Sequence, residues 1–161
     1  DAPRRIVANL PYNISTALLI NWLRQIDAID QMTLMFQKEV VDRIIAEPSS
    51  KAYGRLSVIT QWLCETKFEF HVDKRAFTPP PKVMSSVLTL KPRSAPLHAA
   101  QFEDMEKVTA AAFGQRRKML RSSLKPLDID IEALGIDPTA RAETLSIEEF
   151  CLLAKAIEGR E

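Results

Sequence analysis

Residues 7–15 read VANLPYNIS, an apolar run that stops at Asn9, Leu10, Pro11 and Tyr12 before a helical pattern starts. The segment predicts a strand-turn-helix unit, and this unit sets the fold class. A plain turn explains these four residues by itself, because Asn and Pro favour turns and a nearby Ser or Asn can cap the next helix. Alternatively, the turn presents hydrogen-bond acceptors and an aromatic ring to a planar substrate that carries an amine.

The sequence on both sides of the turn predicts an α/β sheet. The apolar run over 4–10 is typical of a central parallel strand, and apolar residues follow at helical spacing over 18–26. The pattern predicts further strands over 32–37, 67–72 and 85–92, and helices over 38–47 and 55–65. Because only a short loop joins the last two strands, we expect the final strand to be an antiparallel insert.

A polar linker over 93–101, which contains a proline, separates this part from a segment without any strand pattern. Helical patterns cover 102–112, 119–124 and 146–157, and Ser146 with Glu149 fits a capping box. We therefore place a boundary near residue 96, between an α/β part over 1–95 and a small all-helical part over 96–161.

The composition is that of an ordinary soluble domain, with 161 residues of which 46% are apolar and 27% charged. No stretch reaches the roughly 20 apolar residues that span a bilayer, and the start of the chain lacks signal-peptide architecture, so we expect a cytoplasmic protein. Cys64 and Cys151 lie far apart, which predicts buried free thiols rather than a disulfide or a zinc site. His71 and His98 have no partner at ligand spacing, so we expect no metal.

Charge is unevenly distributed along the chain, although the net charge is only +1. Residues 113–125 hold five bases and no acid, whereas the residues from Asp128 onward hold nine acids and three bases. This asymmetry predicts a basic face for an anion beside an acidic, solvated tail.

The basic residues of this segment recur at a helical spacing. Arg117, Arg121 and Lys125 stand at i, i+4 and i+8, which predicts a stripe along one helical face, flanked by Arg116 and Lys118. A basic stripe is commonly just solvated, but the lack of acidic partners favours contact with the phosphates of a nucleic acid. Weaker candidates that could extend this surface are Lys38, Arg43, Lys51 and Arg55.

The chain has four glycines, at positions 54, 114, 135 and 159, and no two are close enough to form a glycine-rich nucleotide loop. A first strand that ends in a candidate site, without a cofactor loop before it, predicts the second half of a domain. The missing initiating Met agrees with this interpretation, although processing also explains it.

Six segments, in the right order and spread over nearly the whole chain, resemble the dimethyladenosine transferases that modify bacterial small-subunit ribosomal RNA. They are ANLPYNIS, FQKEVVDRI, YGRLSV, AFTPPPKVMSSV, AFGQRRKMLRSSL and IDPTARAETLS. The resemblance implies a Rossmann-like domain that uses S-adenosylmethionine, followed by a small helical domain that helps to hold the ribosomal substrate. The implied reaction is dimethylation of the exocyclic N6 amines of two adjacent adenines near the 3′ end of that RNA, with a role in ribosome biogenesis.

The family's glycine-rich cofactor loop and ribose-binding acid have no counterpart in this sequence. The resemblance therefore implies that the chain is the family's latter part, the C-terminal half of the Rossmann-like domain with the helical domain after it. Most of the S-adenosylmethionine site would then be absent from this chain, and we expect it to be inactive alone.

The resemblance also assigns roles to the turn residues. The Asn9 amide oxygen and a carbonyl of the Leu10-Pro11 segment would accept the two N–H bonds of the adenine amine, and Asn9 would form one wall of the cofactor site. Tyr12 would stack on a base that has left its helix. Phe77 precedes a stiff run of prolines and is the second aromatic candidate, although it could also be a core plug beneath a loop.

Other functions compete with this one. A large-subunit ribosomal RNA methyltransferase or a DNA adenine methyltransferase could carry a related turn, but FTPPPKV and QRRKMLRSSL favour the small-subunit family. A non-catalytic RNA-binding or ribosome-assembly module fits the missing glycine loop, yet it leaves the intact NLPY turn unexplained.

Overall fold

The computed structural model describes residues 4–160, so the outermost residues of the two predicted parts, 1–3 and 161, lie outside the described residues. Its sheet has the strand order β1-β2-β4-β3. The strands are β1 (Arg4–Asn9), β2 (Ile29–Gln37), β3 (Cys64–Val72) and β4 (Ser85–Pro92). β1 runs parallel to β2, whereas β4 runs antiparallel to both of its neighbours, β2 and β3. The prediction that the final strand is an antiparallel insert is therefore confirmed.

The prediction of a central, buried first strand is wrong for the described residues. β1 pairs only with β2 within residues 4–160 and forms one edge of the sheet. Its side chains are largely accessible, and Val7 is 82% exposed. A short apolar run indicates a strand that can be covered, but it does not say how many neighbours the strand pairs with.

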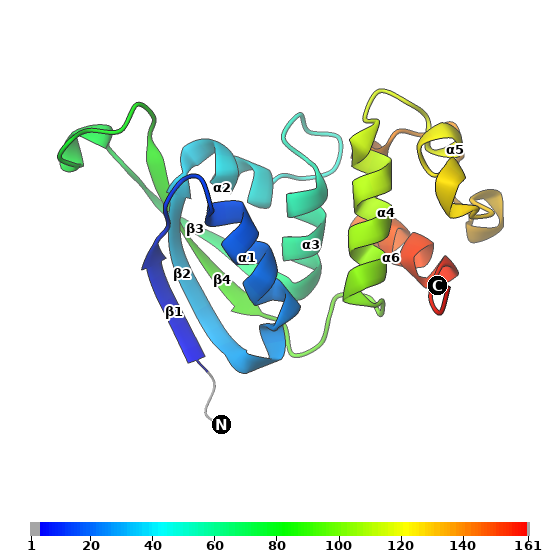
Figure 1. Ribbon diagram of the computed structural model, residues 1–161, viewed down its shortest axis with the longest axis horizontal. Coiled ribbons are helices and arrows are strands. Elements are labelled where there is room, and N and C mark those ends of the chain that lie inside the picture. Colours follow the sequence, from blue (N-terminus) through cyan, green and yellow to red (C-terminus); the bar gives the residue numbers. More distant parts are fainter. Residues whose placement is uncertain (1–3, 161) are drawn as a thin grey trace.

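Three helices cover one face of the sheet (Figure 1). They are α1 (Ser15–Arg24), α2 (Lys38–Ile44) and α3 (Arg55–Leu63). Under them the strands place fully buried side chains, among them Leu34, Phe36 and Leu88. These residues alternate along β2 and β4 with residues that face the other side of the sheet, as expected for a strand period of two.

Helices form the rest of the fold, and no strand occurs between residues 93 and 160. Figure 1 shows this group as a further layer, with α4 (Phe102–Gly114) beside α3, and α5 (Leu120–Ser123) and α6 (Ile147–Ala156) beyond it. Short 3-10 turns connect the elements: η1 (Ile26–Ala28), η2 (Lys74–Ala76), η3 (Lys125–Leu127), η4 (Glu132–Leu134) and η5 (Ala142–Thr144).

The start of α6 confirms the predicted capping box. The Ser146 hydroxyl accepts a hydrogen bond from the Glu149 backbone N–H at 3.2 Å, and the Glu149 carboxylate accepts one from the Ser146 N–H at 3.0 Å. Each side chain satisfies an N–H that the first turn of a helix leaves without a partner.

The predicted helical stripe of basic residues does not form. α5 contains only four residues, so Arg117 lies in the turn before it and Lys125 lies in η3 after it. Pro126 has no backbone N–H to donate to the Ser122 carbonyl, so the α-helical hydrogen bonds end before it and the chain continues as the 3-10 turn η3. At the other end, the backbone N–H of Arg121 donates to the Pro138 carbonyl at 2.9 Å, which ties the start of α5 to the 138–140 loop. The spacing of the basic residues alone could not show where the helix begins and ends.

Both cysteines are buried free thiols, as predicted. Burial raises the pKa of each thiol, Cys64 and Cys151, to about 12. Residues 4–160 contain no helix that is long and apolar enough to cross a membrane, and no group of three or more His, Cys, Asp and Glu side chains arranged to hold a metal ion.

Candidate active site

The turn after β1 is fixed by its backbone and by one buried side chain. Asn9, the last residue of β1, lies opposite Met35 on β2, and the Leu10 N–H donates to the Met35 carbonyl at 3.2 Å. The Leu10 side chain is only 4% exposed and belongs to the core. Leu10 can therefore act on a substrate through its backbone alone, whereas the Asn9 side chain is exposed and free to do so.

The two carbonyls that the sequence left as alternatives differ in this turn. The Pro11 carbonyl accepts a hydrogen bond from the Ile14 N–H at 3.2 Å, which closes the turn before α1. Within residues 4–160 the Leu10 carbonyl accepts no hydrogen bond. The Leu10 carbonyl is therefore the one of the two that has no partner within the described residues.

All five residues predicted for the catalytic site line one cleft, of about 360 Å³. Its lining consists of Asn9, Leu10, Pro11, Tyr12, Phe77, Pro79 and Pro81. The first four come from the end of β1 and the turn that follows it, and the others come from the segment 77–84 that leads into β4. Two acceptors and two aromatic rings from distant parts of the sequence thus surround a space that suits a planar, amine-bearing group.

Tyr12 is held by a partner that the sequence did not indicate. Its hydroxyl lies 2.9 Å from the Ser85 hydroxyl at the start of β4, and the ring remains 38% exposed. Ser85 is 73 residues away along the chain, so no local pattern could have paired the two. Phe77 is half-buried and lines the same cleft.

Arg116, one of the predicted RNA-binding residues, makes contacts inside the protein. Its guanidinium donates to the backbone carbonyls of Tyr53 at 2.7 Å and Lys51 at 2.9 Å, and it forms an ion pair of 3.1 Å with Glu143. It therefore clamps the loop before α3 against the C-terminal part of the chain.

The other four predicted RNA-binding residues are exposed and form no ion pair within residues 4–160. They fall into two pairs. Arg121 and Lys125 line a cleft of about 250 Å³ that also carries Asp128, Asp130 and Glu132. Arg117 and Lys118 do not line that cleft. The basic segment and the acidic tail, which are separate in the sequence, meet in space at Arg121 and Lys125.

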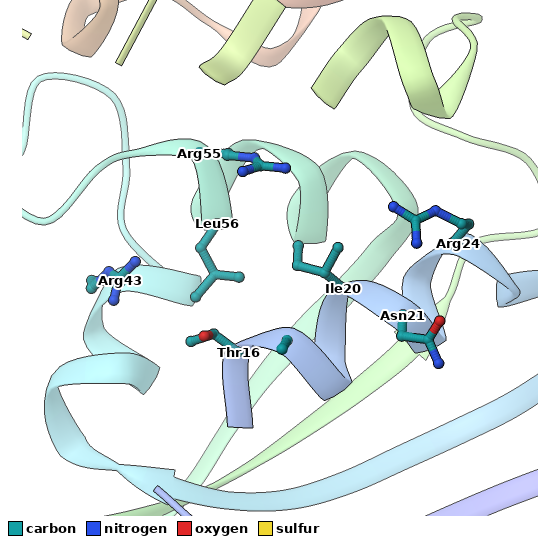
Figure 2. A pocket seen from close by; sticks show the side chains of 8 residues that line it. Thr16, Ile20, Asn21, Arg24, Arg43, Arg55 and Leu56 are labelled. Atoms are coloured by element: carbon teal, nitrogen blue, oxygen red, sulfur yellow. The ribbon is translucent and has the colours of Figure 1, made fainter. Parts of the chain in front are cut away.

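A second basic surface surrounds a cavity of about 400 Å³ between α1, α2 and α3 (Figure 2). Figure 2 shows one arginine from each helix at its rim, Arg24, Arg43 and Arg55, around an apolar floor that includes Ile20 and Leu56. The Glu106 carboxylate of α4 accepts from Arg24 at 2.9 Å and from Arg55 at 3.2 Å. Of these three arginines, Arg43 and Arg55 were predicted from the sequence as weak candidates for RNA contact, and Arg24 was not.

Comparison with known proteins identifies the family of this chain. Residues 2–158 match the family model described as ribosomal RNA adenine dimethylase. The chain belongs to the ribosomal RNA adenine dimethylase family.

Curated relatives of this dimethylase-family chain include two proteins named ribosomal RNA small subunit methyltransferase A. The one from Paramagnetospirillum magneticum is 64% identical over 164 residues, which cover 99% of this chain and 58% of that protein. The one from Rhodospirillum rubrum is 61% identical over 163 residues, which cover 99% of this chain and 56% of that protein. The chain thus spans less than two thirds of the length of these relatives.

Solved structures share the fold. A dimethyladenosine transferase from Plasmodium falciparum is similar with a TM-score of 0.82 and 23% identity, over 95% of this chain and 66% of that one. The 23S rRNA methyltransferase ErmE is similar with a TM-score of 0.66 and 26% identity, over 97% of this chain and 66% of that one. This dimethylase-family chain therefore has a mixed α/β, methyltransferase-like fold.

Proposed function

We propose that the protein dimethylates the exocyclic N6 amines of two adjacent adenines near the 3′ end of small-subunit ribosomal RNA, with S-adenosylmethionine as methyl donor. The observation that carries this proposal is the cleft in which Asn9, Tyr12 and Phe77 converge. Membership of the dimethylase family and the names of the curated relatives support the same reaction.

The chemistry follows from the groups in the cleft. An adenine amine is a poor nucleophile because its lone pair is delocalised into the ring. If the Asn9 amide oxygen and the Leu10 carbonyl accept its two N–H bonds, the nitrogen becomes pyramidal and its lone pair can attack a methyl group. The C–S bond of the donor would break to leave a neutral thioether, and the methylated nitrogen would release one proton to solvent. Tyr12 and Phe77 hold the base by stacking, which offsets much of the cost of taking it out of its helix.

S-adenosylmethionine supplies an electrophilic methyl group on a sulfonium. In this chain Asn9 is the residue that we assign to its site, because the exposed amide stands at the end of β1 beside the cleft. The further assignment, that residues 1–95 are the latter half of a Rossmann-like domain and residues 96–161 a separate helical RNA-substrate domain, is part of the same proposal.

We assign the RNA interface to two surfaces. Arg117, Lys118, Arg121 and Lys125 are exposed and can contact phosphates, and Arg43 and Arg55 at the cavity between the first three helices can extend this contact. Arg116 stays a predicted RNA contact, although its guanidinium already binds backbone carbonyls.

The test is methylation by the full-length protein. We expect N6,N6-dimethyladenosine after incubation with S-adenosylmethionine and unmethylated small-subunit RNA, detected by nucleoside chromatography after nuclease digestion. Methylation of large-subunit RNA instead would favour the activity for which the 23S rRNA methyltransferase ErmE is named. RNA binding without any methyl transfer would favour an assembly module.

A further inference from the structure

A second cleft, of about 320 Å³, lies next to the candidate active site. It is lined by Gln37, Lys38, Glu39, Asp42, Val83 and Met84. The segment 77–84 contributes to both clefts, with Phe77 in the lining of the first and Val83 and Met84 in the lining of the second. The Lys38 N–H donates to the Met84 carbonyl at 2.9 Å, which fixes this wall to the start of α2.

Gln37 connects the second cleft to the first. It lies opposite Ser85 in the β2–β4 register, and the Ser85 hydroxyl is the partner of the Tyr12 hydroxyl at 2.9 Å. Directly opposed residues of an antiparallel pair project to the same face of a sheet. Asn9 projects to that face too, because it lies opposite Met35, two residues before Gln37. Gln37 therefore lies on the same face of the sheet as Asn9 and as Ser85, the partner of Tyr12.

The charges of the second cleft exclude a phosphate as its occupant. Lys38 is paired with Asp42 at 2.8 Å, and Glu39 forms no ion pair within residues 4–160. The lining is therefore net negative, in contrast to the arginine-rimmed cavity between α1, α2 and α3. Phosphates bind cationic surfaces, so the backbone of a nucleic acid avoids this cleft.

The remaining groups suit a nucleobase. Val83 is 45% exposed and forms an apolar wall with Met84, on which the face of a base can pack. The Gln37 side chain forms no hydrogen bond within the described residues. A glutamine amide makes two hydrogen bonds with adenine, at N6 and N7, and a carboxylate such as Glu39 accepts from an exocyclic amine.

We propose that the second cleft binds the base of the nucleotide next to the target adenine, and that Gln37 selects adenine at that position. This inference rests on the proposed function, which makes the target one of two adjacent adenines. It adds a residue that determines specificity and that takes no part in methyl transfer.

The test uses the full-length protein and short RNA hairpins with an unpaired target adenine. The nucleotides on its two sides are, in turn, adenine or uridine, and the measurement is kcat/KM for methylation of the target. The wild type should prefer an adenine neighbour by roughly tenfold, as expected for one bidentate pair. Gln37→Leu, which removes the amide at similar volume, should bring that preference close to one.

Gln31→Leu is the matched control, because Gln31 lies on the same strand and face but at the far end of β2. It should keep the wild-type preference, and thermal melting should confirm that both variants fold. An unchanged preference in Gln37→Leu, or equal wild-type rates on all the hairpins, would overturn this inference while leaving the proposed function intact. If the wild type methylates none of these hairpins, the neighbouring nucleotides are changed in the small-subunit RNA itself, and the same two results decide the inference. If it methylates no small-subunit RNA either, the proposed function fails, and this inference fails with it.

Discussion

The turn at residues 9–12 and the basic segment over 115–125 hold their polar groups by different means. In the turn, backbone hydrogen bonds at Leu10 and Pro11 and the buried Leu10 side chain fix the geometry, and the cleft forms around them. In the basic segment, Arg116 is tied to backbone carbonyls while its neighbours project into solvent. The difference suggests that the turn positions groups for chemistry, whereas the basic segment offers charge whose position matters less.

Asn9→Ala in the full-length protein should have the largest effect on activity. Loss of one preorganised polar group that acts on the transition state should lower the single-turnover methylation rate by about 10² to 10³ at saturating RNA. RNA affinity should stay nearly constant, because the amide acts on the developing ammonium and not on docking. Asn13→Ala is the control, since Asn13 is exposed in the same turn but does not line the cleft. Equal losses of rate and affinity would make Asn9 a structural turn residue.

Within the basic segment, substitution of Arg116 should lower the free energy of unfolding more than substitution of Arg117. Arg116→Met removes hydrogen bonds from a charged group to two backbone carbonyls and should lower the free energy of unfolding by about 1–2 kcal/mol. Arg117→Met removes an exposed side chain and should change it by less than about 0.5 kcal/mol. Urea unfolding of both variants measures the difference. Equal stabilities would show that the Arg116 contacts contribute nothing.

The two exposed pairs of the basic segment should also differ in RNA binding. Replacing Arg117 and Lys118 by Gln should reduce the salt slope of binding by about 1.5 units if both contact phosphates. Replacing Arg121 and Lys125 should reduce it less, because Asp128, Asp130 and Glu132 share their cleft and weaken the local potential. Binding isotherms over a salt series measure both slopes. Unchanged slopes would leave the segment as a solvated surface.

The smallest effect concerns the hydroxyl of Tyr12. Tyr12→Phe keeps the ring and loses the hydrogen bond to Ser85, so the free energy of unfolding should fall by about 0.5–1 kcal/mol and the methylation rate only a few-fold. Ser85→Ala should have a similar effect, and the double variant should lose less than the sum of the two. Additive losses of unfolding free energy would mean that the two hydroxyls do not interact.

The local parts of the fold and site were predictable from the sequence. The turn after β1 depends on adjacent residues, so Asn9, Leu10 and Tyr12 could be named from NLPY, and the capping box at Ser146 depends on residues three apart. β4 spans the predicted range and ends at Pro92, the residue that was expected to stop it.

The long-range parts were not predictable. The Tyr12–Ser85 contact joins the turn after β1 to the start of β4, which only the sheet brings together. The edge position of β1 depends on which strands lie beside it. The spacing of basic residues over 117–125 predicted a longer helix, but α5 has only four residues. The hydrogen bond from Arg121 to the 138–140 loop limits it at one end, and Pro126 limits it at the other. In each case a partner from a distant part of the chain or a single breaking residue overrode the local pattern.

A crystal structure of the full-length protein with a short adenine-containing RNA and an unreactive analogue of S-adenosylmethionine would show where the target base binds. We expect the target base between the rings of Tyr12 and Phe77, with its exocyclic nitrogen about 2.7–3.2 Å from both the Asn9 amide oxygen and the Leu10 carbonyl. A base bound elsewhere, or an exocyclic nitrogen that contacts neither acceptor, would contradict the assignment of this cleft as the site of methyl transfer.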